Sequence, residues 1–119
     1  MIKVSITESD PTGRRSTDPG AKLDAGKLRP ATVFQMFSRA LREVAKVGTY
    51  GIEKYSVGGW QEVPEGRTRY ADAEMRHLLS IWGGEEHDKE SGLLHEAHKA
   101  WNTLAQLELR LREDERSTD

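Results

Sequence analysis

The residues best suited to chemistry lie in one stretch, from Gly84 to Asn102. It places carboxylates, a Ser-Gly turn and histidines ahead of the longest helical pattern in the chain. His95, His98 and Asn102 recur at spacings of three and four, so they share one line of a helix. Two imidazoles one helical turn apart can converge on one cation. A structural role stays open, because a lone histidine beside a core stripe is more often simply hydrogen-bonded.

Carboxylates stand just before these histidines. Glu85 and Asp88 are three residues apart, and Ser91-Gly92 is a plausible helix start. Asp88 or Ser91 could cap the helix by accepting bonds from its first free amides, a role compatible with metal binding. The chain has no cysteine, so a metal must be held by carboxylate, imidazole, amide or water, which suits Mg²⁺, Mn²⁺ or similar ions.

A second charged segment runs from Gly20 to Pro30. Lys22, Lys27 and Arg29 lie among glycines there, with Asp24 between them. Such a loop can wrap backbone amides and cationic side chains around phosphate. It lacks the glycine spacing and the Lys-Ser/Thr pair of a Walker motif, and a solvated, charged linker is the alternative interpretation.

Apolar repeats at spacings of three and four predict the elements that position these residues. Helices are expected over residues 31–46, 50–55, 67–82 and 91–111. Gly48 and Gly51 are expected to interrupt the helical pattern after the first helix, and residues 56–66, which include Trp60, are expected to form a loop. The fold class is therefore all-α: a compact helical domain of three main helices plus one short helix, with an extended N-terminal arm.

The same repeats predict which helix faces are buried. In the last helix the expected buried face consists of Leu93, Ala97, Ala100, Trp101, Leu104, Leu107 and Leu111. His77, with Arg76 beside it, is expected at or near the core face of the preceding helix. Glu43 lies near the C-terminal end of the first helix, where a carboxylate is unfavourable beside the helix dipole unless something positive meets it.

Composition narrows the class of protein. A chain of 119 residues is expected to form one domain, here residues 20–111, between a flexible arm (1–19) and a disordered tail (112–119). A net charge of −2 gives no field for direct nucleic-acid binding. No apolar run reaches membrane-spanning length and the N-terminus lacks a signal-peptide core, so we expect a cytoplasmic protein with no membrane partner.

Four motifs in order carry a family resemblance. They are Gly20-x-Lys22-x-Asp24-x-Gly26-Lys27-x-Arg29, Tyr50-Gly51-x-x-Lys54-Tyr55 followed by Trp60, Arg69-Tyr70-x-Asp72-Ala73-x-x-Arg76-His77, and Gly84-Glu85-x-x-Asp88-x-Glu90-Ser91-Gly92-x-x-His95-x-x-His98-x-x-x-Asn102. Together, over about residues 20–107, they resemble the phage-type dATP/dGTP diphosphohydrolase domain, a relative of the MazG-like all-α nucleotide pyrophosphohydrolases. The occurrence of all four motifs in this order is much more specific for the family than any one motif alone.

The resemblance implies hydrolysis of a purine (deoxy)nucleoside triphosphate to the monophosphate and pyrophosphate. It also implies a divalent metal, Mg²⁺ or Mn²⁺, a homodimer or homotetramer and, if the chain is phage-encoded, the cytoplasm of a bacterial host. The MazG-like pattern pairs Glu-x-x-Glu with Glu-x-x-Asp. Here Glu85-x-x-Asp88 matches the second half, but no Glu-x-x-Glu precedes it and histidines are present instead. Because of this departure, we consider Mn²⁺ as well as Mg²⁺ as the bound ion.

On this basis we expect three groups of site residues. The expected metal ligands are His77, Glu85, Asp88, His95 and His98, and the expected catalytic residues are Glu43, Arg76, Glu85 and Asp88. The expected substrate-binding residues are Lys22, Asp24, Lys27, Arg29, Tyr50, Lys54, Tyr55, Trp60 and Asn102. The basic residues among them would grip the phosphate tail, the aromatic ones would stack the base, and Asn102 would read a base edge or orient a ligand.

Other functions remain open from sequence. A non-catalytic protein could use the same pocket to bind and sequester a nucleotide. An HD-type phosphohydrolase is suggested by His87-Asp88 and His77, but the only late aspartates it could use are Asp114 and Asp119. A helical interaction module, in which the polar line formed by His95, His98 and Asn102 faces a partner protein, is the third alternative.

Overall fold

The computed structural model describes residues 8–117 of the chain. The chain divides into two units, residues 1–36 and 37–119. The sequence Met-Ile-Lys-Val at residues 1–4 suggests a short strand, and these residues lie outside the described range. The helical elements are α1 (Pro30–Phe34), a 3₁₀ turn (Gln35–Phe37), α2 (Ser38–Lys54), a second 3₁₀ turn (Gly59–Glu62), α3 (Gly66–Trp82) and α4 (His95–Ser117).

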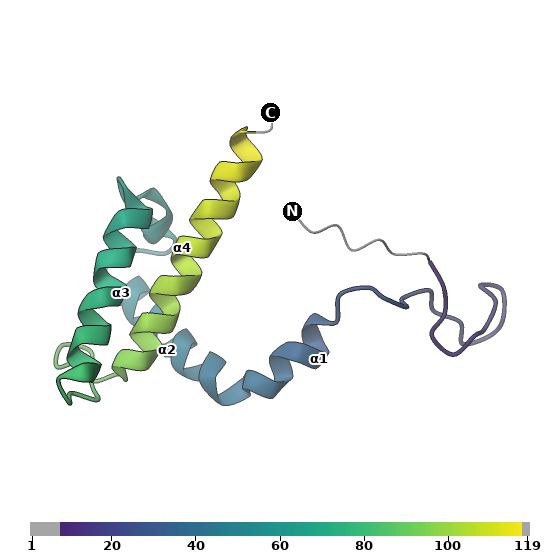
Figure 1. Ribbon diagram of the computed structural model, residues 1–119, viewed down its shortest axis with the longest axis horizontal. Coiled ribbons are helices and arrows are strands. Elements are labelled where there is room, and N and C mark those ends of the chain that lie inside the picture. Colours follow the sequence, from purple (N-terminus) through teal and green to yellow (C-terminus); the bar gives the residue numbers. More distant parts are fainter. Residues whose placement is uncertain (1–7, 118–119) are drawn as a thin grey trace. The chain divides into compact units, whose positions relative to one another are not determined.

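The all-α prediction with three main helices is confirmed (Figure 1). In residues 8–117 the only strand-like pairing is an isolated bridge between His87 and Leu94. The short helix predicted over residues 50–55 is instead the C-terminal part of α2. A different short helix, α1, begins at Pro30, a residue suited to a first helical turn because it has no amide hydrogen to satisfy. No helix in this described range combines the length and apolarity needed to cross a membrane.

The predicted break at Gly48 and Gly51 was wrong, because α2 runs through both glycines to Lys54. Packing against α4 explains one of them. A Cβ added at Gly48 would lie 3.4 Å from Nε1 of Trp101, so the missing side chain lets the indole approach the helix backbone. Contact with α4 therefore offsets the poor helix propensity of glycine.

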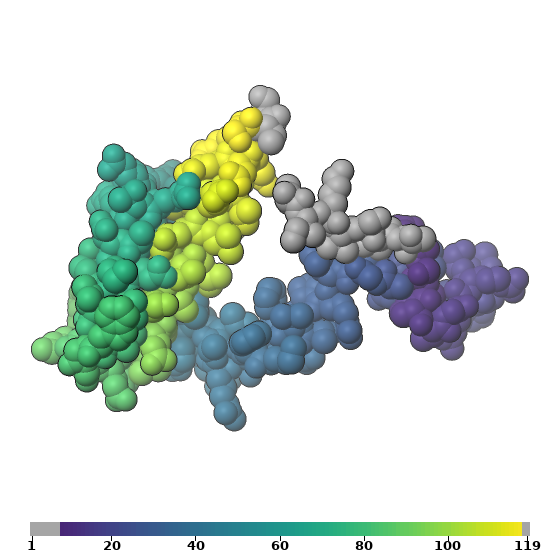
Figure 2. All heavy atoms as spheres, in the orientation of Figure 1, coloured from purple at the N-terminus to yellow at the C-terminus, as the bar shows by residue number. Residues whose placement is uncertain are grey.

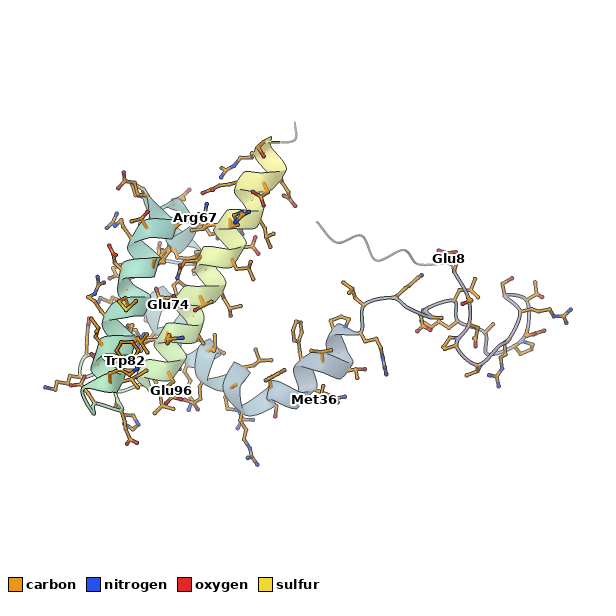
Figure 3. All side chains as sticks on the ribbon, viewed as in Figure 1. Glu8, Met36, Arg67, Glu74, Trp82 and Glu96 are labelled. Carbon is orange, nitrogen blue, oxygen red and sulfur yellow. The ribbon has the colours of Figure 1, made fainter. Side chains whose placement is uncertain are left out.

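Helices α3 and α4 form an antiparallel pair (Figure 3). Near one end, the Arg67 guanidinium lies 2.6 Å from the Glu113 carboxylate, and in the middle Gln106 Nε2 donates to Glu74 at 3.2 Å. Figure 2 shows the side chains of the two helices lying against each other along this pairing. The connecting residues 83–94 hold the acidic motif, so this hairpin positions the candidate site.

The bounds predicted for the last helix were too early at both ends. Helix α4 begins at His95, because residues 83–94 form turns, and it continues past Leu111 to Ser117. Two ion pairs at i,i+4 spacing support the charged extension: Arg112–Glu108 at 2.7 Å and Arg110–Asp114 at 3.2 Å. The division of the chain into arm, domain and tail stays a prediction.

The buried face of α4 was predicted only in part, because Ala97 is buried but the leucines of the predicted stripe are half exposed. Its buried residues are His95, Ala97, His98, Asn102 and Ala105. Leu104, Leu107 and Leu111 of the predicted apolar stripe are 50%, 53% and 50% exposed. The polar line is therefore covered by neighbouring helices, while much of the leucine stripe faces outward.

The first unit is held by a buried carboxylate. Asp10 accepts bonds from the Thr12 amide at 2.6 Å, the Thr12 hydroxyl at 2.5 Å and the Lys22 amide at 2.7 Å. The Ala25 amide donates to the Ser9 carbonyl at 2.9 Å. These bonds join the described part of the predicted arm to the basic loop that follows it.

Candidate active site

A tight turn ahead of α4 builds the acidic side of the site. The Asp88 amide donates to the Leu93 carbonyl at 2.8 Å, and the Gly92 amide donates to the Asp88 carbonyl at 2.7 Å. Gly92 has φ +74°, a left-handed conformation that glycine adopts without a steric penalty. The Ser91 amide donates to Asp88 Oδ2 at 2.8 Å, so the carboxylate is held by the turn that carries it.

Three histidines from α3 and α4 meet beside this turn. Nδ1 of His77 lies 2.8 Å from Nδ1 of His95. The ring of His77 stacks on that of His98 with centroids 4.5 Å apart and 9° between the planes. One ligand atom from each of His77, Asp88 and His95 lies within 4.8 Å of the other two. These residues therefore converge as a metal site requires.

Glu85 fixes the orientation of His95. Nε2 of His95 lies 2.7 Å from Glu85 Oε1, and the imidazole side chain is 3% exposed. A carboxylate facing Nε2 favours the tautomer with hydrogen on Nε2 and a lone pair on Nδ1. That lone pair points toward His77, the direction in which a shared cation would lie.

His98 occupies a different position in the cluster. Its Nε2 lies 2.7 Å from Ser91 Oγ and 3.9 Å from Asp88 Oδ2. It stands edge-on to the ring of Tyr50 on α2, with centroids 6.4 Å apart. His98 thus connects the acidic turn, α2 and the stacked His77.

Burial and local charge tune these groups in opposite directions. Burial, and next the neighbouring His98 and His95, lower the pKa of His77 to about 4. Burial lowers the pKa of His98 as well, against the opposing charge of Asp88. Burial alone would raise the pKa of Asp88, but hydrogen bonds from Ser91 bring it below its usual value. His77 and His98 are therefore neutral and Asp88 is ionised at neutral pH, the protonation states that bind a cation.

A cavity of about 930 Å³ opens beside the cluster, lined by residues of the second unit. Its lining includes His77, Glu85, Asp88, His95, His98 and Asn102. It also includes the basic residues Lys54, Arg69, Arg76 and Lys89 and the aromatic residues Tyr50, Tyr55, Trp60, Tyr70 and Trp101. Cations, metal-ligand donors and aromatic rings thus face one space.

Trp60 is packed into the fold as well as lining the cavity. Its ring contacts Trp101 edge-on with centroids 5.7 Å apart, and its carbonyl accepts the Tyr70 hydroxyl at 2.7 Å. The Arg112 guanidinium lies 5.7 Å from the indole centroid. Trp60 therefore closes one edge of the helical core, the role that loop tryptophans most often have.

The structure gathers most of the predicted residues and leaves others elsewhere. Asn102 is buried, and its Nδ2 donates to the His98 carbonyl at 2.8 Å. Glu43 is outside the cavity lining and pairs with Lys46 on the same helix at 2.7 Å, and its catalytic role stays a prediction. The residues Lys22, Asp24, Lys27 and Arg29 belong to the first unit, and their contact with substrate stays a prediction.

Sequence reasoning missed the roles of several residues. Ser91 was read as a helix start or cap, but its hydroxyl also bonds His98. Glu90 has no role predicted from sequence beyond its place in a motif, yet it pairs with Lys54 at 2.5 Å. The position of Ser91 just after Asp88 is a sequence signal for a turn. The pairing of Glu90 with Lys54 has no such signal, because the two residues are 36 positions apart in the chain.

Comparisons with known proteins identify the family of the chain. A family described as dATP/dGTP diphosphohydrolase, N-terminal, matches residues 17–119. The chain is similar to a protein of Salmonella phage PMBT28 named dATP/dGTP diphosphohydrolase, with 37% identity over 81 residues, or 68% of this chain. The aligned part spans 26% of that relative's length. No solved structure matches. The family match covers most of the chain, which therefore belongs to the dATP/dGTP diphosphohydrolase N-terminal family.

Proposed function

We propose that this domain hydrolyses a purine deoxynucleoside triphosphate to the monophosphate and pyrophosphate, using a divalent metal. The observation that carries the proposal is the convergence of His77, Asp88 and His95 on the wall of a cavity rich in cations and aromatic rings. Family membership and the name of the phage relative support the reaction class.

The donor set fits a divalent cation. His77 and His95 present ring nitrogens 2.8 Å apart, and Asp88 adds a carboxylate oxygen. We propose these as the ligands and Glu85 as the group that orients His95, with His98 as a further candidate ligand. The paired imidazoles favour Mn²⁺ over Mg²⁺ here, since Mg²⁺ prefers oxygen ligands. When bound, the ion would neutralise phosphate charge and lower the pKa of a water.

The chain's own groups would hold the substrate and leaving group. Arg76, Arg69 and Lys54 line the cavity and can bind phosphate oxygens, which stabilises charge on departing pyrophosphate. Tyr50 and Tyr55 line it as well and offer faces for a purine. Asn102 lines the same cavity while its Nδ2 donates to the His98 carbonyl, and we propose that it orients a ligand or reads a base edge.

The exposed apolar faces support a homodimer or homotetramer. Besides the leucine stripe of α4, Met75, Leu79 and Trp82 recur along α3 and are 50%, 56% and 70% exposed. Apolar surface of this extent is typical of surfaces that associate. We propose the host cytoplasm as the location if the chain is phage-encoded.

A substrate screen tests the proposed reaction. The purified chain is incubated with each common ribo- and deoxynucleoside triphosphate in Mg²⁺ or Mn²⁺, and products are identified by chromatography. We expect purine deoxynucleoside monophosphate and pyrophosphate, formed only with metal. Nucleotide binding without turnover would instead indicate a sequestering protein, and intact triphosphate release would indicate HD-type chemistry.

A further inference from the structure

A lysine and a glutamate face each other at the exposed edge of the cavity. Lys54 is the last residue of α2, and Glu90 lies in the acidic turn before α4. The Lys54 Nζ and a Glu90 carboxylate oxygen are 2.5 Å apart, and both residues line the cavity. Their side chains are 36% and 61% exposed. The pair therefore joins α2 to the turn that carries Asp88, within reach of a ligand in the cavity.

Two tyrosines restrict where Lys54 can go. Its Nζ lies 5.9 Å from the ring centroid of Tyr50 and 5.2 Å from that of Tyr55. Aromatic faces attract an ammonium group, so these rings hold Lys54 near the cavity whether or not Glu90 is present. The position of the lysine is thus supported from two sides, while its charge is balanced by Glu90 alone among the contacts described.

The Lys54–Glu90 ion pair contributes little to the stability of the fold, so Lys54 is able to exchange Glu90 for another anion. An exposed ion pair adds little to the free energy of folding, because water screens it. A phosphate chain carries several negative charges and forms short, charge-assisted hydrogen bonds with ammonium groups. Such a ligand can therefore compete with the Glu90 carboxylate for Lys54, and its binding would also release the side-chain hydrogen bond between Glu90 and Tyr50.

We propose that Glu90 is a positioning residue that sets the affinity for the substrate's phosphate chain by competing with it for Lys54. The inference rests on the proposed function only for the substrate class, a nucleoside triphosphate. In the free domain Glu90 balances the charge of Lys54 at the cavity edge. On binding, the phosphate chain takes the ammonium group and Glu90 turns to solvent.

Calorimetry with inorganic tripolyphosphate tests this directly, with EDTA present so that metal binding does not contribute. Glu90→Gln should tighten tripolyphosphate binding about two- to fivefold, the range expected when one exposed ion pair is removed from the competition. Lys54→Gln should weaken binding. In the double variant the effect of Glu90→Gln should vanish, because the two residues act through one ammonium group.

Glu113→Gln is the matched control. Glu113 forms an interhelical ion pair with Arg67 at 2.6 Å, with side chains similarly exposed, and neither residue lines the cavity. This change alters net charge by the same amount and should leave binding unchanged. Equal tightening in the control, or tightening that persists with Lys54→Gln, would show a general charge effect and overturn the proposal. Unchanged or weaker binding with Glu90→Gln would overturn it as well.

Kinetics separate this role from a purely structural one. Glu90→Gln should lower KM for the nucleotide by a similar factor and leave kcat within about twofold, as expected for uniform binding. A large fall in kcat would mean that Glu90 shapes the Asp88 turn instead, against the proposal. If no nucleotide is turned over but tripolyphosphate binding responds through Lys54, the role of Glu90 stands and the proposed hydrolysis fails.

Discussion

At the scale of single residues, the site depends on how each ring and carboxylate is held. Glu85 bonds Nε2 of His95, and His95 in turn faces His77. The Asp88 carboxylate is fixed by the Ser91 amide. His95 and Asp88 therefore each have a partner that sets the direction of the side chain, which is the arrangement that raises metal affinity over that of free side chains.

Asp88→Asn should abolish metal-dependent turnover while the fold survives. Asparagine can still accept the Ser91 amide bond, but it lacks the negative charge that a cation requires. We expect a fall in kcat on the order of 100-fold or more, comparable with the loss of a metal-ligand contact. Pyrophosphate release and far-UV circular dichroism would be measured together. Glu86→Gln is the control, because Glu86 is exposed and outside the cavity lining, and turnover by Asp88→Asn at the wild-type rate would remove Asp88 from the site.

The histidines also predict how the stability of the metal-free protein depends on pH. The folded pKa of His77 is about 4, lowered by burial, whereas the unfolded chain titrates near its ordinary value of 6.5. Between these values the unfolded state binds more protons, so the free energy of unfolding falls as pH drops from 6.5 toward 4. Above this window His77 contributes no pH dependence.

Urea unfolding in EDTA at several pH values measures this slope. His77→Gln should flatten it, since the substituted side chain does not titrate. The exposed His87 offers a control, because His87→Gln removes a histidine outside the cavity lining. An unchanged slope in His77→Gln would contradict the assignment to His77.

At the scale of elements, the sequence predicted helix content better than helix faces. The spacing of His95, His98 and Asn102 correctly placed them on one line of α4. Hydrophobicity favoured the neighbouring leucines as the buried face, but Leu104 and Leu107 are half exposed. The face of a helix that is buried depends on which other helix packs against it. Here α3 packs against the side of α4 that carries His95 and His98, and the sequence spacing within α4 does not reveal such a long-range contact.

Glycines in α2 illustrate the same limit. Propensity predicted a break, yet α2 passes through Gly48, beside the Trp101 indole, and through Gly51, where an added Cβ would meet nothing within 4 Å. Gly51→Ala should therefore raise the free energy of unfolding by about 0.5–1 kcal/mol, the propensity difference in a helix interior. Gly48→Leu should lower it by about 1–3 kcal/mol through overpacking against Trp101. Chemical denaturation of both variants checks the contrast, and destabilisation by Gly51→Ala would contradict the observed helix.

At the scale of the whole molecule, the acidic and imidazole cluster belongs to the second unit and the basic loop to the first. The family resemblance predicts that Lys22, Lys27 and Arg29 of this loop bind the phosphate tail of the same nucleotide, and this stays a prediction. Within the first unit the loop has its own support, because Asp10 holds the Lys22 amide at 2.7 Å. A role for the loop can therefore be tested without altering the second unit.

Asp10→Ala and Lys27→Ala, each made in the full chain, should raise KM for the nucleotide with kcat unchanged. Lys27→Ala removes a cation, and we expect an increase of about tenfold, the effect of losing one charge-assisted hydrogen bond of about 1.5 kcal/mol. Asp10→Ala leaves the basic residues in place but releases the Lys22 amide, so it should act in the same direction.

Asp18→Ala is the matched control for that comparison. The Asp18 carboxylate accepts the Arg15 amide at 2.8 Å in the same unit, but no bond described for it reaches the basic loop. Steady-state kinetics of the three variants would separate the possibilities. If Asp18→Ala raises KM as much as Asp10→Ala, general loosening of the unit explains the effect. If neither Asp10→Ala nor Lys27→Ala changes KM, the segment is a solvated linker. Phosphate recognition then depends on the cations of the cavity, because these are the basic groups that line it together with the metal-ligand cluster.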